Sequence, residues 1–137
     1  MVLLDGDKTR KILILRKNKY SKKNRIKLSF MYSKLCKLLN DQGIDVIIST
    51  ISLFKQIDKW NRKNIRGYKE IFLDISLDKL KKRDSKQIYA RKRYSNKPTV
   101  GIDIIPDFPK NPHVLIYPNK VNKNQTFNFL LNQLKIK

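Results

Sequence analysis

Residues 3–10 read LLDGDKTR, a short apolar run that ends in two aspartates on either side of a glycine. The apolar residues favour a buried strand over Val2–Asp5, and the charged residues after the turn favour a helix over Lys8–Leu15. A strand that passes through a tight turn into a helix is typical of α/β domains, which bind ligands at the carboxyl ends of their parallel strands. The turn Asp5-Gly6-Asp7 is therefore the first candidate for a functional site.

Strand and helix patterns alternate along the rest of the chain. Runs rich in β-branched residues predict strands over Ile44–Ile51 and Tyr68–Ile75, each apolar enough to be covered on both faces, and a last strand over His113–Tyr117. The pattern also predicts helices at 22–41, 55–65, 77–83, 86–93 and after Asn122, with an ordered loop at 94–112. We expect one α/β domain over residues 1–137, a three-layer fold with a mostly parallel sheet and helices on both faces.

Local signals mark the ends of these helices. Ser21 and Asn122 are predicted to cap the second and the last helix, Ser76 is predicted to cap the helix through Arg83, and Gly43 and Gly67 are predicted to end two others. Apolar stripes should face the core. They comprise Leu28, Met31, Leu35, Leu38 and Leu39 in one helix and Phe127, Leu130, Leu131 and Leu134 in the last.

The chain is strongly basic, with a formal net charge of +21 from 32 basic and 11 acidic residues. Such a charge is typical of proteins that bind polyanions, but the lysines are scattered over every segment and no RNA-binding aromatic motif accompanies them. Lysine, asparagine and isoleucine share A/T-rich codons, which favours genome bias over a nucleic-acid site. No apolar run approaches the roughly 18 residues of a membrane span, and the single Cys36, interpreted as core filler, fits a cytoplasmic location.

Polar side chains follow three of the predicted strands. Asp5 and Asp7 follow the first, Ser52 the second and Asp74 the third, with Arg10 and Arg25 nearby in the sequence. Carboxylates suit a magnesium ion, and guanidinium groups suit phosphate or sulfate. The sequence therefore predicts a site for a phosphorylated ligand with Mg²⁺. The alternative, left open by the residues alone, is that both aspartates only cap the helix that follows.

Six segments in a fixed order carry a family resemblance. They are LLDGDKTR at 3–10, KYSKKNR at 19–25, TISLFK at 50–55, RDSKQIY at 83–89, VGID at 100–103 and KNP at 110–112. In these segments the chain resembles the adenylylsulfate kinase (APS kinase) family, which phosphorylates the 3′-hydroxyl of adenosine 5′-phosphosulfate. The resemblance implies a P-loop NTPase-like fold, a phosphotransferase that uses ATP and Mg²⁺, and a place in sulfate assimilation.

The resemblance also implies a role for each matching residue. Asp5 would lie near the magnesium ion and the reacting hydroxyl, and Ser52 would be the second catalytic residue. The substrate-binding residues would be Asp7, Arg10, Tyr20, Arg25, Ile51, Ser52 and Lys86. Arg25 would hold the sulfate-phosphate end, Tyr20 would pack on the adenine, and Arg83 would lie near the adenine of ATP.

Several positions depart from the family pattern. Leu28 and its neighbours replace polar substrate contacts, Leu53 replaces a proline, Lys55 replaces an arginine, and Thr99 stands in place of a phenylalanine. Another sulfated or phosphorylated nucleotide therefore stays open as the substrate.

The four glycines, Gly6, Gly43, Gly67 and Gly101, include no pair at the GxxxxGK[ST] spacing of a phosphate-binding loop. We expect that the sequence is a fragment, or has a mis-assigned start, of a longer kinase, that it lacks the family's first strand, P-loop and first helix, and that alone it is inactive. The alternatives are a degenerate fold that closes up, or another polypeptide that supplies the missing unit. The rival functions are a basic nucleic-acid-binding module and a degenerate partner subunit, and a homodimer stays open.

Overall fold

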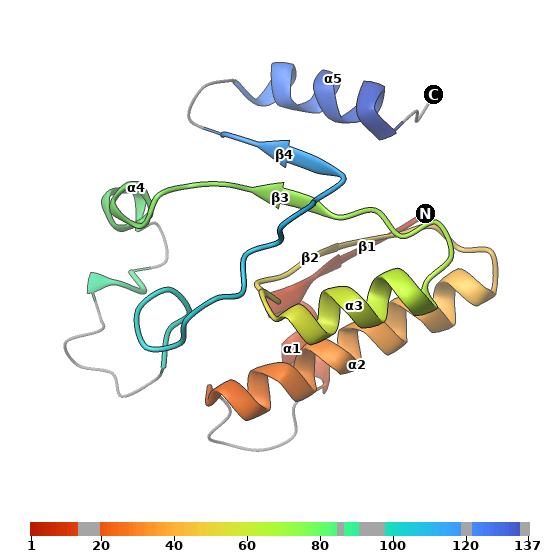
Figure 1. The fold of residues 1–137 in the computed structure, drawn as a ribbon, viewed down its shortest axis with the longest axis horizontal. Helices are drawn as coiled ribbons and strands as arrows, with labels where there is room; N and C mark the ends of the chain where they lie inside the picture. The colour runs from red at the N-terminus through yellow and green to blue at the C-terminus, as the bar shows by residue number, and fades with distance from the viewer. Residues whose placement is uncertain (14–19, 85–86, 91–97, 119–121, 135–137) are drawn as a thin grey trace. The chain divides into compact units, whose positions relative to one another are not determined.

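The structure is a computed structural model that describes residues 1–13, 20–84, 87–90, 98–118 and 122–134. In chain order its elements are β1 (Val2–Asp5), α1 (Gly6–Leu13), α2 (Lys22–Asp41), β2 (Val46–Ser49), α3 (Lys55–Asn64), β3 (Ile71–Leu73), α4 (Leu77–Arg83), β4 (Val114–Ile116) and α5 (Lys123–Leu134) (Figure 1). They fall into two compact units, Met1–Tyr68 with Lys97–Phe108, and Lys69–Asn96 with Pro109–Lys137. Each unit contains one pair of parallel strands, which confirms the predicted α/β class.

The first unit is built on the parallel pair β1 and β2. Their register aligns Val2 with Val46 at one end and Asp5 with Ser49 at the other, so that both carboxyl ends lie together. Figure 1 shows α2 and α3 side by side, and α2 also packs against β2. Phe54, Ile57 and Ile104 form the buried cluster of the unit, and the rings of Phe30 and Trp60 meet edge to face with their centroids 6.2 Å apart. These contacts hold α2 and α3 together.

The bounds of α2 follow from its capping residues, as predicted. Ser21 is the N-cap, and its Oγ accepts the N–H of Asn24 at 3.3 Å. Gly43 follows the helix with φ +78°, a conformation that glycine adopts without steric cost. The buried face differs from the predicted stripe, because Met31 and Leu38 are 42% and 58% exposed. The buried residues are Leu28, Ser29, Tyr32, Ser33 and Cys36, and burial raises the pKa of the Cys36 thiol, which suits core filler.

The strands β2 and β3 are both shorter than the apolar runs from which they were predicted. β2 covers Val46–Ser49 within the predicted 44–51, and β3 covers Ile71–Leu73 within the predicted 68–75. Along β1 and β2, half-buried residues alternate with exposed ones, and Leu3 and Ile47, which are paired across the two strands, are 73% and 46% exposed. Burial on both faces, predicted for β2 and β3, is therefore wrong for both strands, since Ile71 and Leu73 of β3 are also 38% and 54% exposed. The burial predicted for β1 is wrong at Leu3. The β-branched composition reports strand propensity, and it does not fix which faces become covered.

The second unit pairs β3 with β4 in parallel, aligning Ile71 with Val114. The imidazole Nδ1 of His113 accepts the N–H of Glu70 at 3.0 Å beside the start of these strands. At the start of α5 the side chains of Asn122 and Gln125 each accept the backbone N–H of the other residue, a reciprocal cap that confirms the predicted role of Asn122. Ser76 precedes α4 in an extended conformation but makes no capping hydrogen bond through its side chain. In the region predicted as a helix at 86–93, residues 88–90 form turns, and residues 86 and 91–93 lie outside the described part.

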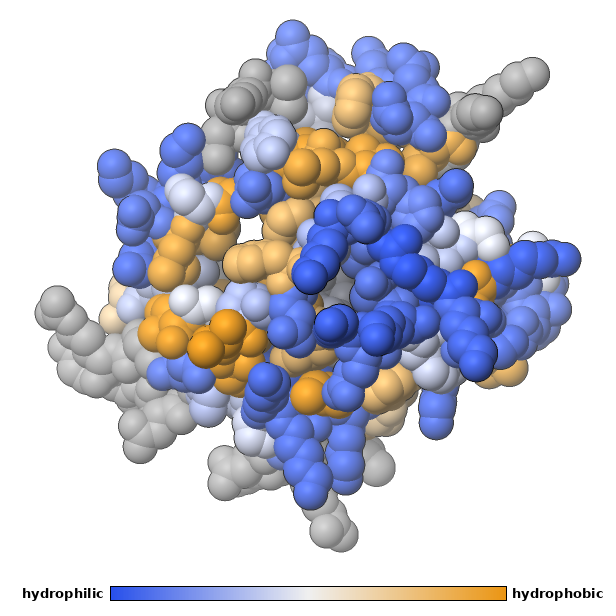
Figure 2. All heavy atoms as spheres, viewed as in Figure 1, coloured by the Kyte–Doolittle hydropathy of each residue, from blue (hydrophilic) through white to orange (hydrophobic). Residues whose placement is uncertain are grey.

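The surface reflects the composition. Figure 2 shows hydrophilic side chains over much of the viewed face, with smaller apolar patches between them. None of the described helices combines the length and the apolar character that crossing a lipid bilayer requires.

Candidate functional site

The predicted acidic turn lies where β1 and β2 end. Oδ1 of Asp5 accepts the backbone N–H groups of Asp7 and Lys8, each at 2.9 Å, and the Asp5 carbonyl accepts the hydroxyl of Thr9 at 2.8 Å. Asp5 is therefore the N-cap of α1, so the capping interpretation of this residue is confirmed. The carboxylate keeps a second oxygen, so that capping and ligand contact are compatible at this position.

Gly6 leaves no room for a side chain between the strand ends. A Cβ atom at this position would lie 2.7 Å from the carbonyl oxygen of Ser49 and 3.0 Å from the methyl carbon of Thr50. The carbonyl oxygen of Gly6 accepts the hydroxyl hydrogen of Tyr32 at 2.7 Å in a buried contact. The glycine of LLDGD thus allows the end of β1 to approach β2 closely.

One face of α2 organises the site. Arg25, Ser29 and Tyr32 are spaced four and three residues apart, which places them on the same side of the helix. We call these three residues the α2 face. The Tyr32 hydroxyl donates to the carbonyl of Gly6, the first residue of α1. Ser29 donates its hydroxyl hydrogen to Oγ of Ser52 at 3.0 Å, beyond the end of β2. Burial raises the pKa of Tyr32, against the opposing effect of Arg10. The α2 face therefore joins the loops that follow β1 and β2.

Two guanidinium groups lie beside one aromatic ring. The Cζ atoms of Arg10 and Arg25 are 5.2 and 5.5 Å from the centre of the Tyr20 ring. Arg25 also donates through Nε to the carbonyl of Tyr20 at 3.1 Å and through Nη2 to the carbonyl of Pro98 at 2.8 Å. Burial lowers the pKa of Arg25, the charge of Arg10 lowers it further, and Tyr20 opposes both. We call Arg10 and Arg25 the arginine pair.

The arginine pair has no carboxylate partner among the ion pairs of the described residues. Among the described residues, Lys37 pairs with Asp41 and Arg62 pairs with Asp58, and neither ion pair involves these two arginines. Nε of Arg10 is buried and has no hydrogen-bond partner among the described residues. A buried donor without a partner costs free energy, and two nearby positive charges repel each other. An anion beside the two guanidinium groups would offset their mutual repulsion.

Three hydroxyl groups form a chain next to the strand ends. Oγ of Ser52 lies 3.0 Å from Ser29 Oγ and 2.9 Å from Thr50 Oγ1. Ser29 is 3% exposed, Ser52 is half-buried and Thr50 is exposed. We call this set the hydroxyl chain. It runs from the interior of the unit to its surface, beside Ile51, which is 65% exposed.

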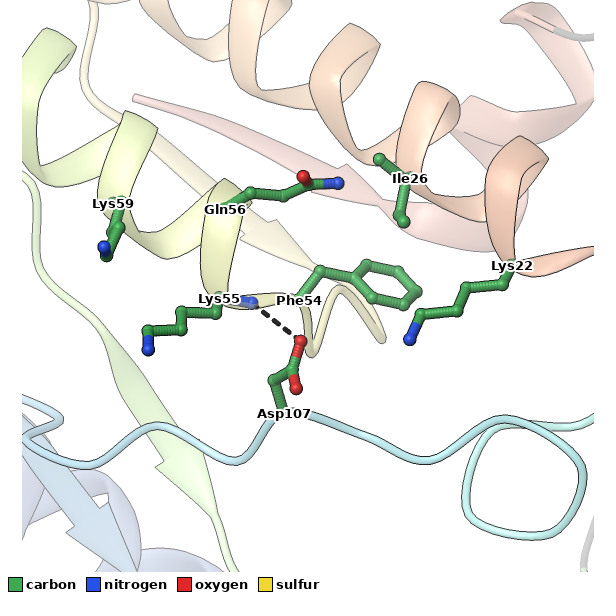
Figure 3. Close-up of a pocket in the computed structure, with 7 residues that line it drawn as sticks. All are labelled: Lys22, Ile26, Phe54, Lys55, Gln56, Lys59 and Asp107. Atoms are coloured by element: carbon green, nitrogen blue, oxygen red, sulfur yellow. Dashed lines mark hydrogen bonds between the residues drawn. The ribbon is translucent and has the colours of Figure 1, made fainter.

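A basic hollow of about 390 Å³ lies at the start of α3. Figure 3 shows Lys22 and Lys55 on either side of Asp107, whose Oδ2 accepts the backbone N–H of Lys55 at 3.1 Å and so caps α3. The residues that line the hollow are Lys22, Ile26, Phe54, Lys55, Gln56, Lys59 and Asp107. None of these is among the predicted site residues, so the hollow is a feature separate from the acidic turn.

Residues 1–117 match the family model described as adenylylsulphate kinase. The chain belongs to the adenylylsulphate kinase family. It is 36% identical over 127 residues to the cytidine diphosphoramidate kinase of Campylobacter jejuni, covering 90% of this chain and 71% of that protein. It is 32% identical over 137 residues to the adenylyl-sulfate kinase of Clostridium kluyveri, covering 98% of this chain and 68% of that protein.

A solved structure extends the likeness to the fold. The APS kinase of Mycobacterium tuberculosis, in complex with AMPPNP and APS, matches with a TM-score of 0.80 and 26% identity, covering 97% of this chain and 79% of that one. The predicted P-loop NTPase-like fold is thereby confirmed. Family membership and the kinase relatives together make the chain a member of a phosphotransferase family.

The first unit brings most of the predicted site residues into one region. Asp5, Asp7 and Arg10 lie at the turn and on α1. The Tyr20 ring lies beside both Arg10 and Arg25. Ser52 and Ile51 follow β2. Arg83 is exposed at the end of α4 in the second unit, and Lys86 lies outside the described residues, so the roles given to these two stay predictions.

Three residues of this region were not predicted as site residues from the sequence. Gly6 was noted only as part of the turn, and Ser29 and Tyr32 were not considered as site residues. Their helical spacing from Arg25 was the available signal, because a serine and a tyrosine in line with an arginine form a polar face beside the apolar stripe.

The RDSKQIY segment carries a carboxylate that organises its own turn. Asp84 accepts the N–H of Tyr89 at 3.1 and 3.2 Å through its two oxygens and the N–H of Ala90 at 2.8 Å. Desolvation raises the pKa of Asp84, but the backbone hydrogen bonds from Ala90, Tyr89 and Ile88 outweigh it and leave the pKa below its usual value. The ionised Asp84 carboxylate therefore stabilises the turn at pH values above its unfolded-state pKa of about 3.9. This stabilisation is lost as the pH falls through the lower folded-state pKa.

We expect acid, or Asp84→Asn at neutral pH, to weaken this turn. The check is amide hydrogen exchange at Tyr89 and Ala90, followed by NMR as the pH is lowered and corrected for the intrinsic rate. Protection should fall at these two amides before it falls in α5, which serves as the internal reference. Equal protection at these amides in the wild type and in Asp84→Asn at neutral pH would contradict the assignment.

Proposed function

We propose that this chain forms the nucleotide-substrate side of a kinase that transfers the γ-phosphoryl group of ATP to the 3′-hydroxyl of adenosine 5′-phosphosulfate. The observation that carries the proposal is the arginine pair beside Tyr20, with the unpartnered Nε of Arg10. A ligand with an anionic group would offset the repulsion between the two arginines, and an aromatic base on that ligand would pack on the Tyr20 ring. The family match over residues 1–117 supports the reaction class.

Each predicted residue has a chemical role in this proposal. Arg10 and Arg25 hold the sulfate-phosphate group, the ring of Tyr20 packs on the base, and Asp7 lines the substrate site. Ser52 contacts the nucleotide through its hydroxyl, and Ile51 does so through its backbone. Lys86 faces phosphate groups, and Arg83 lies near the adenine of ATP. The geometry of the first unit supports the grouping of Arg10, Tyr20 and Arg25.

The acidic turn fits a magnesium ion whose ligands come partly from the protein and partly from phosphate and water. Among the described residues no cluster of three or more metal-ligating side chains exists, and one oxygen of Asp5 is already used for capping. Mg²⁺ in kinases is commonly held by one or two carboxylates, with phosphate oxygens and water completing its coordination. Asp5 would hold the ion, which would supply charge neutralisation for the transferred phosphoryl group. The rest of the chemistry is positioning of the substrate hydroxyl near Asp5.

We infer that a polypeptide of these 137 residues binds the substrate nucleotide without turning over ATP. Phosphoryl transfer in this superfamily uses backbone amides of a glycine-rich loop and its lysine to hold the ATP phosphates. The four glycines of the sequence do not provide that spacing. Binding of the acceptor nucleotide is therefore the measurement that tests the proposed function.

A second substrate is favoured by a specific comparison. The cytidine diphosphoramidate kinase is 36% identical to this chain, whereas the adenylyl-sulfate kinase of Clostridium kluyveri is 32% identical. The arginine pair suits the diphosphate-linked group of that nucleotide as well as a phosphosulfate. Cytidine diphosphoramidate is therefore the second candidate.

The test is isothermal titration calorimetry with adenosine 5′-phosphosulfate, cytidine diphosphoramidate, AMP and CMP. We expect saturable 1:1 binding of one of the first two nucleotides, at least tenfold tighter than that of its monophosphate control. A single-stranded RNA oligomer, titrated at low and at physiological salt, is the matched polyanion. If the RNA binds tightly with a steep salt dependence and the four nucleotides bind equally weakly, a general polyanion site replaces the proposal.

A further inference from the structure

Ser29 is a buried hydroxyl that is bonded to a residue of the proposed site. It lies on α2, is 3% exposed, and donates to Oγ of Ser52 at 3.0 Å. Because Ser29 is closed off from solvent, it has no access to a ligand. The hydrogen bond to Ser52 is the side-chain route by which Ser29 would act on ligand binding, and a change in the packing of α2 is the alternative that a control variant must exclude.

We propose that Ser29 is a positioning residue, which orients the hydroxyl of Ser52 so that its hydrogen is available to the bound nucleotide. The inference rests on the proposed function, because it gives Ser52 a nucleotide to contact. Ser29 would then be a core residue that influences nucleotide binding through its hydrogen bond to Ser52.

The hydrogen-bonding capacity of the Ser52 hydroxyl decides in which direction its hydrogen points. A serine hydroxyl has one hydrogen to donate and two lone pairs that accept. The bond from Ser29 occupies one lone pair, and Thr50 Oγ1, at 2.9 Å, is able to donate to the other. Once both lone pairs are occupied, the hydrogen of Ser52 points away from Ser29 and Thr50. That arrangement makes Ser52 a donor toward an anionic oxygen, the same chemistry that the arginine pair offers.

Burial makes this orientation specific. A hydroxyl at an exposed position exchanges partners with water, but Ser29 has no such alternative at 3% exposure. Removing its oxygen leaves Ser52 without a fixed donor on its inner side, so the Ser52 hydroxyl becomes free to rotate toward Thr50 or inward. The nucleotide then has to reorient this group on binding, which we expect to weaken affinity by roughly threefold to tenfold.

The chain offers a matched control on the same helix. Ser33 lies four residues after Ser29 and is 5% exposed. Ser29→Ala and Ser33→Ala delete the same atom from similarly buried positions of α2. A general effect of hydroxyl removal from the core would appear in both variants, whereas an effect transmitted through Ser52 would appear only in Ser29→Ala.

The experiment measures two quantities for wild type, Ser29→Ala, Ser33→Ala, Ser52→Ala and the Ser29→Ala/Ser52→Ala double variant. The first is the Kd for the nucleotide that wild type binds, and the second is stability from urea unfolding. We expect Ser29→Ala to lose roughly threefold to tenfold in affinity and Ser33→Ala to stay within about twofold. In the Ser52→Ala background, Ser29→Ala should cause no further loss of affinity, and the unfolding data should show coupling between the two serines.

Two results would overturn the inference. One is equal loss of affinity in Ser29→Ala and Ser33→Ala, which indicates packing alone. The other is additivity of Ser29→Ala and Ser52→Ala in the unfolding cycle, a result that needs no nucleotide. If wild type binds none of the nucleotides, the proposed function is wrong and Ser29 loses its positioning role with it, whereas coupling in the unfolding cycle would still show the hydroxyl bond itself.

Discussion

Gly6→Ala should lower the free energy of unfolding by about 1–3 kcal/mol, the usual cost of forcing an extra carbon into a packed site. The added Cβ would lie 2.7 Å from the carbonyl oxygen of Ser49, which belongs to β2 and pairs with Asp5 across the strands. Backbone that is held in a strand pair does not move aside cheaply. The bond from Tyr32 to the Gly6 carbonyl is strained by the same shift, so we expect α2 to be disturbed together with the strand ends. Urea unfolding followed by circular dichroism measures the loss.

Gly43 supplies the matched control for this substitution. Gly43 has φ +78°, and a Cβ added there would have open space for 4 Å around it, so Gly43→Ala tests backbone strain without crowding. Gly43→Asn should be nearly neutral, because asparagine tolerates the left-handed region. Thr50→Ser removes the methyl carbon that lies 3.0 Å from the added Cβ of Gly6→Ala and should rescue that variant only in part. A Gly6→Ala protein as stable as wild type would show that the strand ends are not held this closely.

The sequence allowed accurate prediction where the determinant is local. The two ends of α2 follow from Ser21 and Gly43, and the start of α5 follows from Asn122, since each residue acts on backbone groups within a turn of itself. The strand lengths were less accurate, because pairing decides how much of an apolar run becomes a strand. The run at 44–51 becomes strand only over Val46–Ser49, where Val2–Asp5 lies opposite.

The site shows the same division. Asp5 and Ser52 were predicted because parallel strands end at one edge, and the register of Asp5 with Ser49 places the residues that follow the two strands together. Ser29 and Tyr32 were missed because each is buried by a partner more than twenty residues away in the sequence, namely Ser52 and Gly6. A periodicity argument that counts only apolar residues assigns the buried face to Met31 and Leu38, which the structure leaves exposed. Long-range hydrogen bonds redirected the helix face, and no local pattern encodes them.

Arg10→Met should separate binding from stability. Methionine keeps an unbranched apolar stem but removes the charge that repels Arg25 and the buried Nε that lacks a partner. Against these gains stands the loss of the contact with the Tyr20 ring, worth roughly 0.5–1 kcal/mol. We therefore expect the free energy of unfolding to stay within about 1 kcal/mol of wild type. Affinity for the nucleotide should fall by roughly tenfold to a hundredfold, because a hydrogen bond to a charged group is lost.

Arg62→Met is the control for this change, since Arg62 also lies beside a tyrosine ring, at 6.0 Å from the centre of Tyr68, and pairs with Asp58 on α3. It removes the same charge and one ring contact from a position outside the proposed site, so nucleotide affinity should stay within about twofold of wild type at moderate salt. Calorimetric titration and urea unfolding on both variants give the comparison. A residue that serves only packing would show the opposite pattern in Arg10→Met, with stability lost and affinity kept. That outcome would remove the arginine pair from the binding site, because the proposal depends on two adjacent positive charges that an anion would neutralise.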